Sequence, residues 1–232
     1  MDELRRQELP GLRVVTSDGL AVFYLALNTR PRVEGRANPL ADARVRQALE
    51  LATDRREIAR EGLHGFGQPA WQLVVPQVFG YDPAAPEPPY DPERARRLLA
   101  EAGQAGLRVR LSLRTTSPDW LERILARQWA AAGIATAVER LEAQAYNQAL
   151  DGGRFEATVQ GYGCTTGDVG ELLSFILRRA DAGHGLGNGN IAGYARPEVD
   201  RIADGNLRVF DPRERLEMLQ QALRLASRDL PY

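Results

Sequence analysis

Lysine is absent from this chain of 232 residues, so all 30 basic side chains are arginines. Without a lysine there is no amine for a Schiff base and no lysine for a GxxxxGK[ST] phosphate loop, which excludes both kinds of site. The codons of a GC-rich genome produce the same arginine bias. Adaptation to heat is the weaker explanation, because the usual thermophile signal includes lysine.

Cysteine and histidine are almost as scarce, since the chain holds one cysteine, Cys164, and two histidines, His64 and His184. A single cysteine forms no internal disulfide and says nothing about the cellular compartment. The sequence contains no CxxC, HExxH or acidic calcium-loop motif. It therefore predicts neither a metal site nor a cofactor.

Long apolar runs are also missing: no stretch reaches 18 apolar residues, so the sequence predicts no membrane-spanning helix. The first residues, "MDELRRQELPGLRVV", lack the apolar core of a signal peptide. This leaves either a cytoplasmic protein or a piece of a longer secreted one. The formal net charge of −1 is not that of a protein that binds nucleic acid or an anionic membrane.

The composition, 44% hydrophobic and 26% charged, is that of a globular protein, and the length suits one large domain or lobe. "LRVVTSDGLAVFYLALNT" predicts two strands around a Ser-Asp-Gly turn, the second apolar on both faces and therefore central in its sheet. "ADARVRQALELATDRREIAREGLHG" predicts two helices, the second capped by Asp54 with Glu57. Residues 66–90, rich in proline, glycine and aromatics, predict a loop that wraps the fold.

Three further helices are predicted by a capping side chain followed by proline, in "DPERARRLLAEAG", "SPDWLERILARQWAAAG" and "DPRERLEMLQQALRLASRDL". The first two end on glycine, as a left-handed helix terminus requires. "LRVRLSLR", "IATAVERL" and "FEATVQ" predict strands, and "EAQAYNQAL" predicts a helix between the last two. This alternation indicates an α/β fold with helices packed on a sheet.

The segment "VQGYGCTTGDVGEL", residues 159–172, follows the last of these strands. Ligands of open α/β sheets bind beyond the carboxyl ends of strands, so its position favours a site. Its glycines miss the GxGxxG dinucleotide spacing by one residue. An enzyme hypothesis uses Cys164 as nucleophile and His184 as base, and the alternative is a cysteine that only packs.

Two other places offer polar groups. In the Gly/Asn-rich residues 183–200, which lead into a helix near Pro197, Asn188, Asn190 and Tyr194 offer hydrogen bonds, although a flexible turn explains them equally well. Arg114 ends the strand "LRVRLSLR", where a guanidinium would suit a carboxylate ligand or would simply be solvated.

Several stretches together carry a family resemblance. They are, in order, "YLALNTRP", "DARVRQALELATDRREIAREGLHGFGQPA", "VFGYDP", "YDPERARRLLAEAG", "GYARPEVDRI" and "FDPRERLEMLQQALRLASRDLPY". In order and spacing the chain resembles the extracellular solute-binding proteins of family 5, the peptide- and nickel-type receptors of ABC importers. The resemblance covers nearly the whole chain.

The resemblance implies one α/β lobe of a two-lobed periplasmic-binding-protein-like fold (class II, cluster C type), with a mixed sheet flanked by helices. Residues 1–232 would be the second, C-terminal ligand-binding lobe; the first lobe, the returning C-terminal segment and the signal segment would lie outside the chain. The implied activity is not enzymatic. A monomeric receptor, periplasmic or lipid-anchored, would close two lobes over a peptide or peptide-like solute and deliver it to ABC permease subunits.

In dipeptide receptors of this family the loop matching 159–172 usually reads W-x-x-D-x-x-D-P. On that pattern Tyr162 stands for the tryptophan and would stack on the ligand, Thr165 for the aspartate that holds the peptide amine, and Asp168 for the second aspartate, while Val169 replaces the proline. Arg114 falls where an arginine holds the peptide carboxylate. The resulting candidate ligand site consists of Arg114, Tyr162, Thr165, Thr166, Asp168, Asn188, Asn190 and Tyr194.

Thr165 departs from the family pattern, because a threonine cannot neutralise an ammonium group. Either Asp168 takes over that role, or the ligand lacks a simple peptide amine there. The alternatives that stay open are a receptor of the same family for a nickel chelate, a glutathione-like solute or an oligosaccharide, a sensor or interaction domain that reuses the lobe, and the Cys164/His184 enzyme.

Overall fold

The computed structural model describes residues 17–232 and has a four-stranded mixed sheet in the order β1-β6-β4-β5. β1 (Ala21–Leu27) runs antiparallel to β6 (Ala157–Gly163), whereas β4 (Arg108–Arg114) is parallel to both β6 and β5 (Ala135–Leu141). Helices cover this sheet, which confirms the predicted α/β class. The first strand predicted within residues 12–15 lies outside the described residues.

Helices and short turns complete the chain. Those before β6 are η1 (Pro39–Ala41), α2 (Ala43–Leu51), α3 (Arg55–Glu57), η2 (Ile58–Gly62), α4 (Pro92–Glu101), α5 (Asp119–Ala131) and α6 (Ala143–Asp151). Those after it are α7 (Val169–Leu172), η3 (Leu173–Leu177), α8 (Pro197–Gly205), η4 (Asn206–Arg208) and α9 (Pro212–Asp229). A two-stranded hairpin pairs β2 (Arg32–Val33) with β3 (Arg36–Ala37). No described helix is long and apolar enough to cross a membrane.

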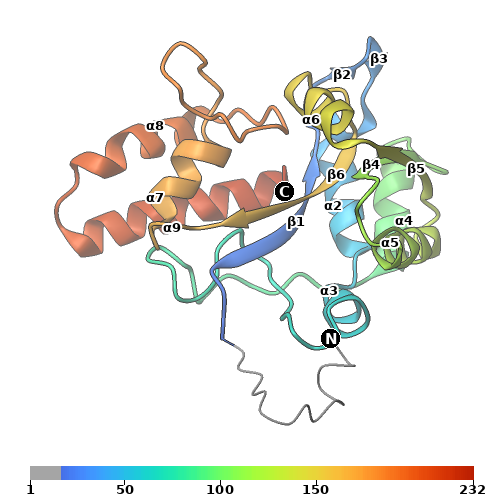
Figure 1. Cartoon of the computed structure of the whole chain (residues 1–232), viewed down its shortest axis with the longest axis horizontal. Helices are drawn as coiled ribbons and strands as arrows, with labels where there is room; N and C mark the ends of the chain where they lie inside the picture. Colours follow the sequence, from blue (N-terminus) through green and yellow to red (C-terminus); the bar gives the residue numbers. More distant parts are fainter. Residues whose placement is uncertain (1–16) are drawn as a thin grey trace, which may run out of the picture.

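Two cores divide the molecule into halves. The sheet core lies among α2, α4, α5 and the sheet, and its largest fully buried side chains are Leu40, Leu49, Leu99, Leu111, Leu113, Leu125, Trp129 and Ile134. The helical core lies among α7, η3, α8 and α9 and includes Val169, Leu172, Leu173, Ile176 and Leu219. In Figure 1 β1 and β6 form a long ribbon that runs from one half to the other. β6 therefore begins in the sheet core, at Ala157, and ends in the helical core, at Tyr162.

Helix capping follows the predicted pattern in two of three cases. Asp91 caps α4 and Asp211 caps α9 through side-chain oxygens that accept backbone N–H groups, each with proline in the first turn. At α5 the prediction of a Ser117 cap was wrong by one residue, because the helix begins at Asp119 and Pro118 holds the cap position without a side-chain bond. Gly103 and Gly133 follow α4 and α5 with φ of +70° and +79°, as predicted.

Within residues 17–232 β1 is the outermost strand of the sheet, which differs from the predicted central position. Among the described residues it pairs only with β6, and Phe23 is 72% exposed. The strand is apolar on both faces because each face meets a different cluster. Leu27 belongs to the sheet core, and Ala26 packs with Tyr146 beneath α6.

Residues 66–90 wrap the molecule as predicted. Val74 and Val78 enter the helical core, and the Asp82 carboxylate accepts a hydrogen bond from Arg224 of α9 at 2.6 Å. The backbone of Phe79 exchanges two hydrogen bonds with residues 167–169, at 2.8 and 2.9 Å. This loop therefore supports the segment that follows β6.

Candidate ligand-binding site

β4 and β6 are parallel and adjacent, so their carboxyl ends point toward the same end of the sheet. Arg114 ends β4 two residues after the last β4–β6 pair, Ser112 with Thr158, whereas β6 runs on to Gly163 before residues 164–168 follow it. Arg114, Thr165 and Thr166 are exposed, whereas Tyr162 and Cys164 are buried. The guanidinium predicted to bind a carboxylate and the predicted loop thus each follow the carboxyl end of a strand, on two parallel neighbours.

Helix α6 holds the Arg114 guanidinium on one side only. The guanidinium carbon lies 5.1 Å from the centre of the Tyr146 ring, a cation–π contact, and Nη2 donates to Asn147 Oδ1 at 3.0 Å. A guanidinium has five N–H groups, so most of the donors of Arg114 stay available for an anion. An exposed arginine fixed by a ring and an amide suits a carboxylate.

A buried hydrogen-bond network fixes Tyr146 in turn. Its hydroxyl lies 2.6 Å from Thr158 Oγ1 and accepts from Gln160 Nε2 at 2.6 Å. Thr158 Oγ1 also lies 2.8 Å from the carbonyl of Ser112 on β4. Burial raises the pKa of Tyr146, so the ring stays neutral beside Arg114. The network therefore fixes α6 against β4 and β6.

The Asp168 carboxylate is an internal structural group. It accepts from both Nη atoms of Arg215, at 2.6 and 2.8 Å, and from the backbone N–H of Gly170 in the first turn of α7. Burial raises the pKa of Asp168, but the bonds from Arg215 and Gly170 outweigh it and the pKa lies below its usual value. Arg215 neutralises the charge that the sequence hypothesis offered to a ligand amine.

Replacing Asp168 with asparagine should cost stability in a pH-dependent way. A carboxyl group whose pKa is lowered by folding stabilises above its unfolded pKa, about 3.9, and loses that contribution as the pH falls through the folded value. Urea unfolding should show the variant about 1–2 kcal/mol less stable at pH 5–7, a difference that shrinks below about pH 4. The exposed Asp151→Asn change should leave stability nearly unchanged, and a constant Asp168→Asn difference down to pH 2 would contradict the account.

Thr165 and Thr166 are held together by Glu171, one turn into the following helix. Thr165 Oγ1 donates to Glu171 at 3.1 Å, and Thr166 donates both its backbone N–H and its hydroxyl to Glu171 Oε2, each at 2.8 Å. The spacing from Asp168 to Glu171 matches a capping box, a signal that the sequence analysis did not use for this segment. The glutamate instead reaches back to the two threonines.

Tyr162 is 6% exposed and packs in the helical core beside Cys164, which leaves little of the ring for stacking. Burial raises the pKa of Tyr162 strongly, and the neighbouring Cys164 and Glu171 side chains raise it further. The ligand contact expected of Tyr162 stays a prediction.

Within the described chain, the three candidates from residues 183–200 make no hydrogen bond to Arg114 or to residues 164–168. Asn190 is buried and bonds to the carbonyls of Arg178 and Tyr194, and the Tyr194 hydroxyl donates to Asp229 at 2.7 Å. Asn188 is exposed and donates to Gly185. Asn190 and Tyr194 thus organise the loop in front of α8, and their contact with a ligand stays a prediction.

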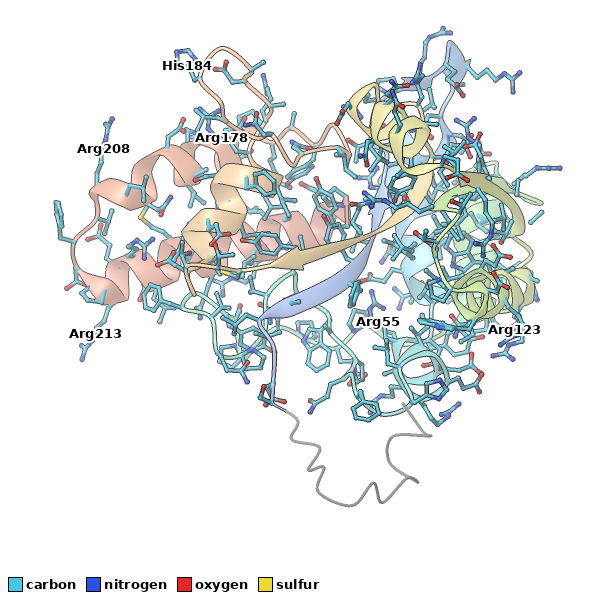
Figure 2. The ribbon with its side chains drawn as sticks, viewed as in Figure 1. Arg55, Arg123, Arg178, His184, Arg208 and Arg213 are labelled. Atoms are coloured by element: carbon cyan, nitrogen blue, oxygen red, sulfur yellow. The ribbon has the colours of Figure 1, made fainter. Side chains whose placement is uncertain are left out.

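The enzyme hypothesis gains no geometric support. Cys164 Sγ donates to the Asp168 carbonyl at 3.4 Å, while His184 Nδ1 lies 2.8 Å from Asp181 in an exposed loop. Figure 2 shows His184 pointing outward from the loop above α8. Within residues 17–232 the two side chains share no hydrogen bond, the contact that an activated nucleophile needs. The same residues hold no group of three potential metal ligands.

Comparison with known proteins assigns the chain. The family described as "Bacterial extracellular solute-binding proteins, family 5 Middle" matches residues 2–184. The chain belongs to this family. Its members are solute-binding proteins, and the predicted resemblance is confirmed.

Named relatives match almost all of the chain. Heme-binding protein A of Haemophilus influenzae is 26% identical over 96% of this chain and 40% of its own length. Di/tripeptide-binding protein 4 of Pseudomonas aeruginosa is 32% identical over 100% of this chain and 43% of its own length. The chain thus spans about two fifths of the length of these relatives.

A solved structure shares the fold. The periplasmic binding protein DppA from Helicobacter pylori, in complex with the peptide STSA, superposes with a TM-score of 0.88 at 24% identity. The match covers 100% of this chain and 44% of that one. The predicted periplasmic-binding-protein-like fold, with its mixed sheet flanked by helices, is therefore confirmed.

Sequence reasoning missed Tyr146, Asn147 and Glu171. The helix that carries Tyr146 was predicted, and its place directly after β5 could have indicated that its first turn lies near the ends of the strands. The contact of Tyr146 with Arg114 depends on side-chain packing across three elements, which no local pattern encodes.

Proposed function

We propose that residues 1–232 are the second ligand-binding lobe of a two-lobed receptor of an ABC importer. The receptor captures a peptide or peptide-like solute between its lobes and delivers it to permease subunits in the membrane. It acts as a monomer outside the cytoplasm, catalyses no reaction and carries no cofactor.

The observation that carries this proposal is that the Arg114 side chain is exposed, held in place and free to bind an anion. Its guanidinium is exposed at the carboxyl edge of the sheet, is supported by Tyr146 and Asn147, and makes no ion pair among the described residues. A carboxylate is the group that such a guanidinium binds best. The relatives named for di- and tripeptides, together with the peptide-bound neighbour, support a peptide carboxylate as the partner.

The open geometry supports a second lobe. Arg114, Thr165 and Thr166 face solvent, and the surface hollows beside Tyr90 and beside Arg201 contain none of the candidate residues. A small-molecule site buries most of its ligand, so an exposed edge of this kind needs a facing surface. Closure of another lobe would supply it.

The decisive experiment compares the 232-residue chain with a two-lobed receptor that carries it. Native mass spectrometry of the two-lobed protein should detect a co-purified ligand with a free carboxylate, and its mass separates a peptide from a nickel chelate, a glutathione-like solute or an oligosaccharide. The 232-residue chain should bind the same ligand weakly or not at all, because half of the contact surface is missing. Tight binding by this chain alone would contradict the two-lobe proposal.

A further inference from the structure

The ribbon of β1 and β6 is covered on one face for only part of its length. Residues directly opposite one another in an antiparallel pair share a face, and the sheet core covers this face as far as Leu25. The next two pairs on the same face are Phe23 with Gly161 and Ala21 with Gly163. All four of these residues are exposed, so the face is open where the ribbon leaves the sheet core.

The Phe23 ring is held in place but is not buried. A Cβ atom added at Gly161 would lie 3.3 Å from a ring carbon of Phe23, so the ring leans across the ribbon over this glycine. The residue is nevertheless 72% exposed. A large aromatic ring that is supported on one side and open on the other is suited to stacking against a group from outside the chain.

The glycine at position 163 is not required by the fold. Its φ is not positive, and no atom of the described chain lies within 4 Å of a Cβ added there. Glycine weakens the interior of a strand, and a strand glycine often marks a place where a ligand or another backbone approaches closely. Gly163 therefore indicates, independently of Phe23, an occupant that lies against the backbone of β6.

This open face adjoins the candidate ligand loop. Gly163 directly precedes that loop, and the Cys164 N–H donates to the carbonyl of Leu20, just before β1, at 3.1 Å. The exposed residues Thr165 and Thr166 follow at once. The four residues of the open face carry no charged or hydrogen-bonding side chain. A ligand held by the loop would thus meet a purely apolar surface beside it.

We propose that Phe23, with Gly161 and Gly163 beside it on β6, forms a subsite for a flat apolar group of the ligand, such as an aromatic side chain of a peptide. The proposal rests on the receptor function proposed above and names the class of solute that the receptor selects. The ligand group would stack on the Phe23 ring and lie over Gly163, where a larger side chain would occupy its place. Phe23 is therefore a specificity-determining residue.

The test uses a two-lobed receptor carrying this chain and two pooled libraries of di- to pentapeptides, one with phenylalanine at each position where the other has serine. Native mass spectrometry reads the bound fraction, and titration gives the affinity. The wild type should bind the phenylalanine peptides about threefold to tenfold more tightly. Phe23→Ala should remove this preference and leave the affinity for serine peptides unchanged. Phe210→Ala, the same change at a site that is 92% exposed before α9, should keep the preference.

Gly163→Val is the second variant, because it fills the space over β6 and leaves Phe23 in place. The chain has room for the added Cβ and strands favour valine, so thermal unfolding should show a folded protein that has lost the preference. Equal binding of both libraries by the wild type, or a preference that persists in both folded variants, would overturn the subsite and leave the receptor function standing. An equal loss of affinity for both libraries in Phe23→Ala would assign the ring to the facing lobe and overturn the subsite. Failure of the wild type to bind either library would overturn the peptide receptor and this subsite together.

Discussion

The free energy of unfolding of the chain should fall by about 3–5 kcal/mol when Trp129 is replaced with alanine. Trp129 is fully buried in the sheet core, and its indole N–H donates to Thr53 Oγ1 at 3.1 Å. The substitution removes the largest side chain of that core and leaves the hydroxyl of Thr53 with one partner fewer, so transfer and cavity costs add. Chemical denaturation followed by circular dichroism measures the loss.

Two control variants separate the causes of this loss. Trp120→Ala removes the same side chain from a half-buried position on the same helix, α5, and should cost about half as much or less. Thr53→Val keeps the volume of the side chain but removes the hydroxyl that accepts from the indole and donates to the Leu49 carbonyl at 2.7 Å, and it should cost about 1–2 kcal/mol. A loss at Trp129 no larger than the loss at Trp120 would show that the sheet core does not carry the fold as described.

Arg114→Ala should weaken binding of a carboxylate-bearing ligand by a two-lobed receptor about tenfold to a hundredfold, without loss of stability. The side chain is exposed and, within residues 17–232, makes one hydrogen bond and one cation–π contact, so its removal costs the fold little. Its remaining donors are what a carboxylate would use. Isothermal titration with the co-purified ligand, and with its amidated form, measures the effect.

The matched control is Arg123→Ala, which removes an arginine from the outer helix α5 (Figure 2) and should leave affinity unchanged. Arg114→Lys should recover only part of the affinity, because an ammonium group cannot bind a carboxylate through two parallel bonds. An amidated ligand should bind the wild type and Arg114→Ala equally. If the alanine variant bound the carboxylate ligand with wild-type affinity, Arg114 would not belong to the site.

Most of the correct fold predictions came from patterns among residues that are close together in sequence. The Asp-Pro helix starts at α4 and α9 and the glycines that end α4 and α5 are local patterns, and each is present where it was expected. The strands β4 and β5 match their predicted segments to within one residue, whereas β6 begins two residues later than predicted and ends three residues later. Local rules failed where burial came from a distant partner. β1 looked like a central strand because two separate clusters cover its faces, a fact that depends on the packing of α2 and α6.

The candidate site shows the same difference between features that local patterns predict and features that depend on long-range contacts. The prediction that Arg114 and the 159–172 segment follow the carboxyl ends of two strands came from local patterns, and their joint contact with a ligand stays a prediction. The roles within the segment depend on long-range contacts: Asp168 pairs with Arg215, 47 residues away, and is thereby removed from the list of free charges. Tyr162 turned inward because the end of β6 reaches the helical core.

The sequence by itself determined the α/β class, the starts of α4 and α9 set by capping residues, and the family resemblance. Only the tertiary structure decided which carboxylate is free and which is paired, and which aromatic ring supports Arg114. The physical reason is the separation in sequence over which each kind of interaction acts. Capping and alternation act over a few residues, whereas ion pairing and burial depend on groups that folding brings together from distant parts of the chain.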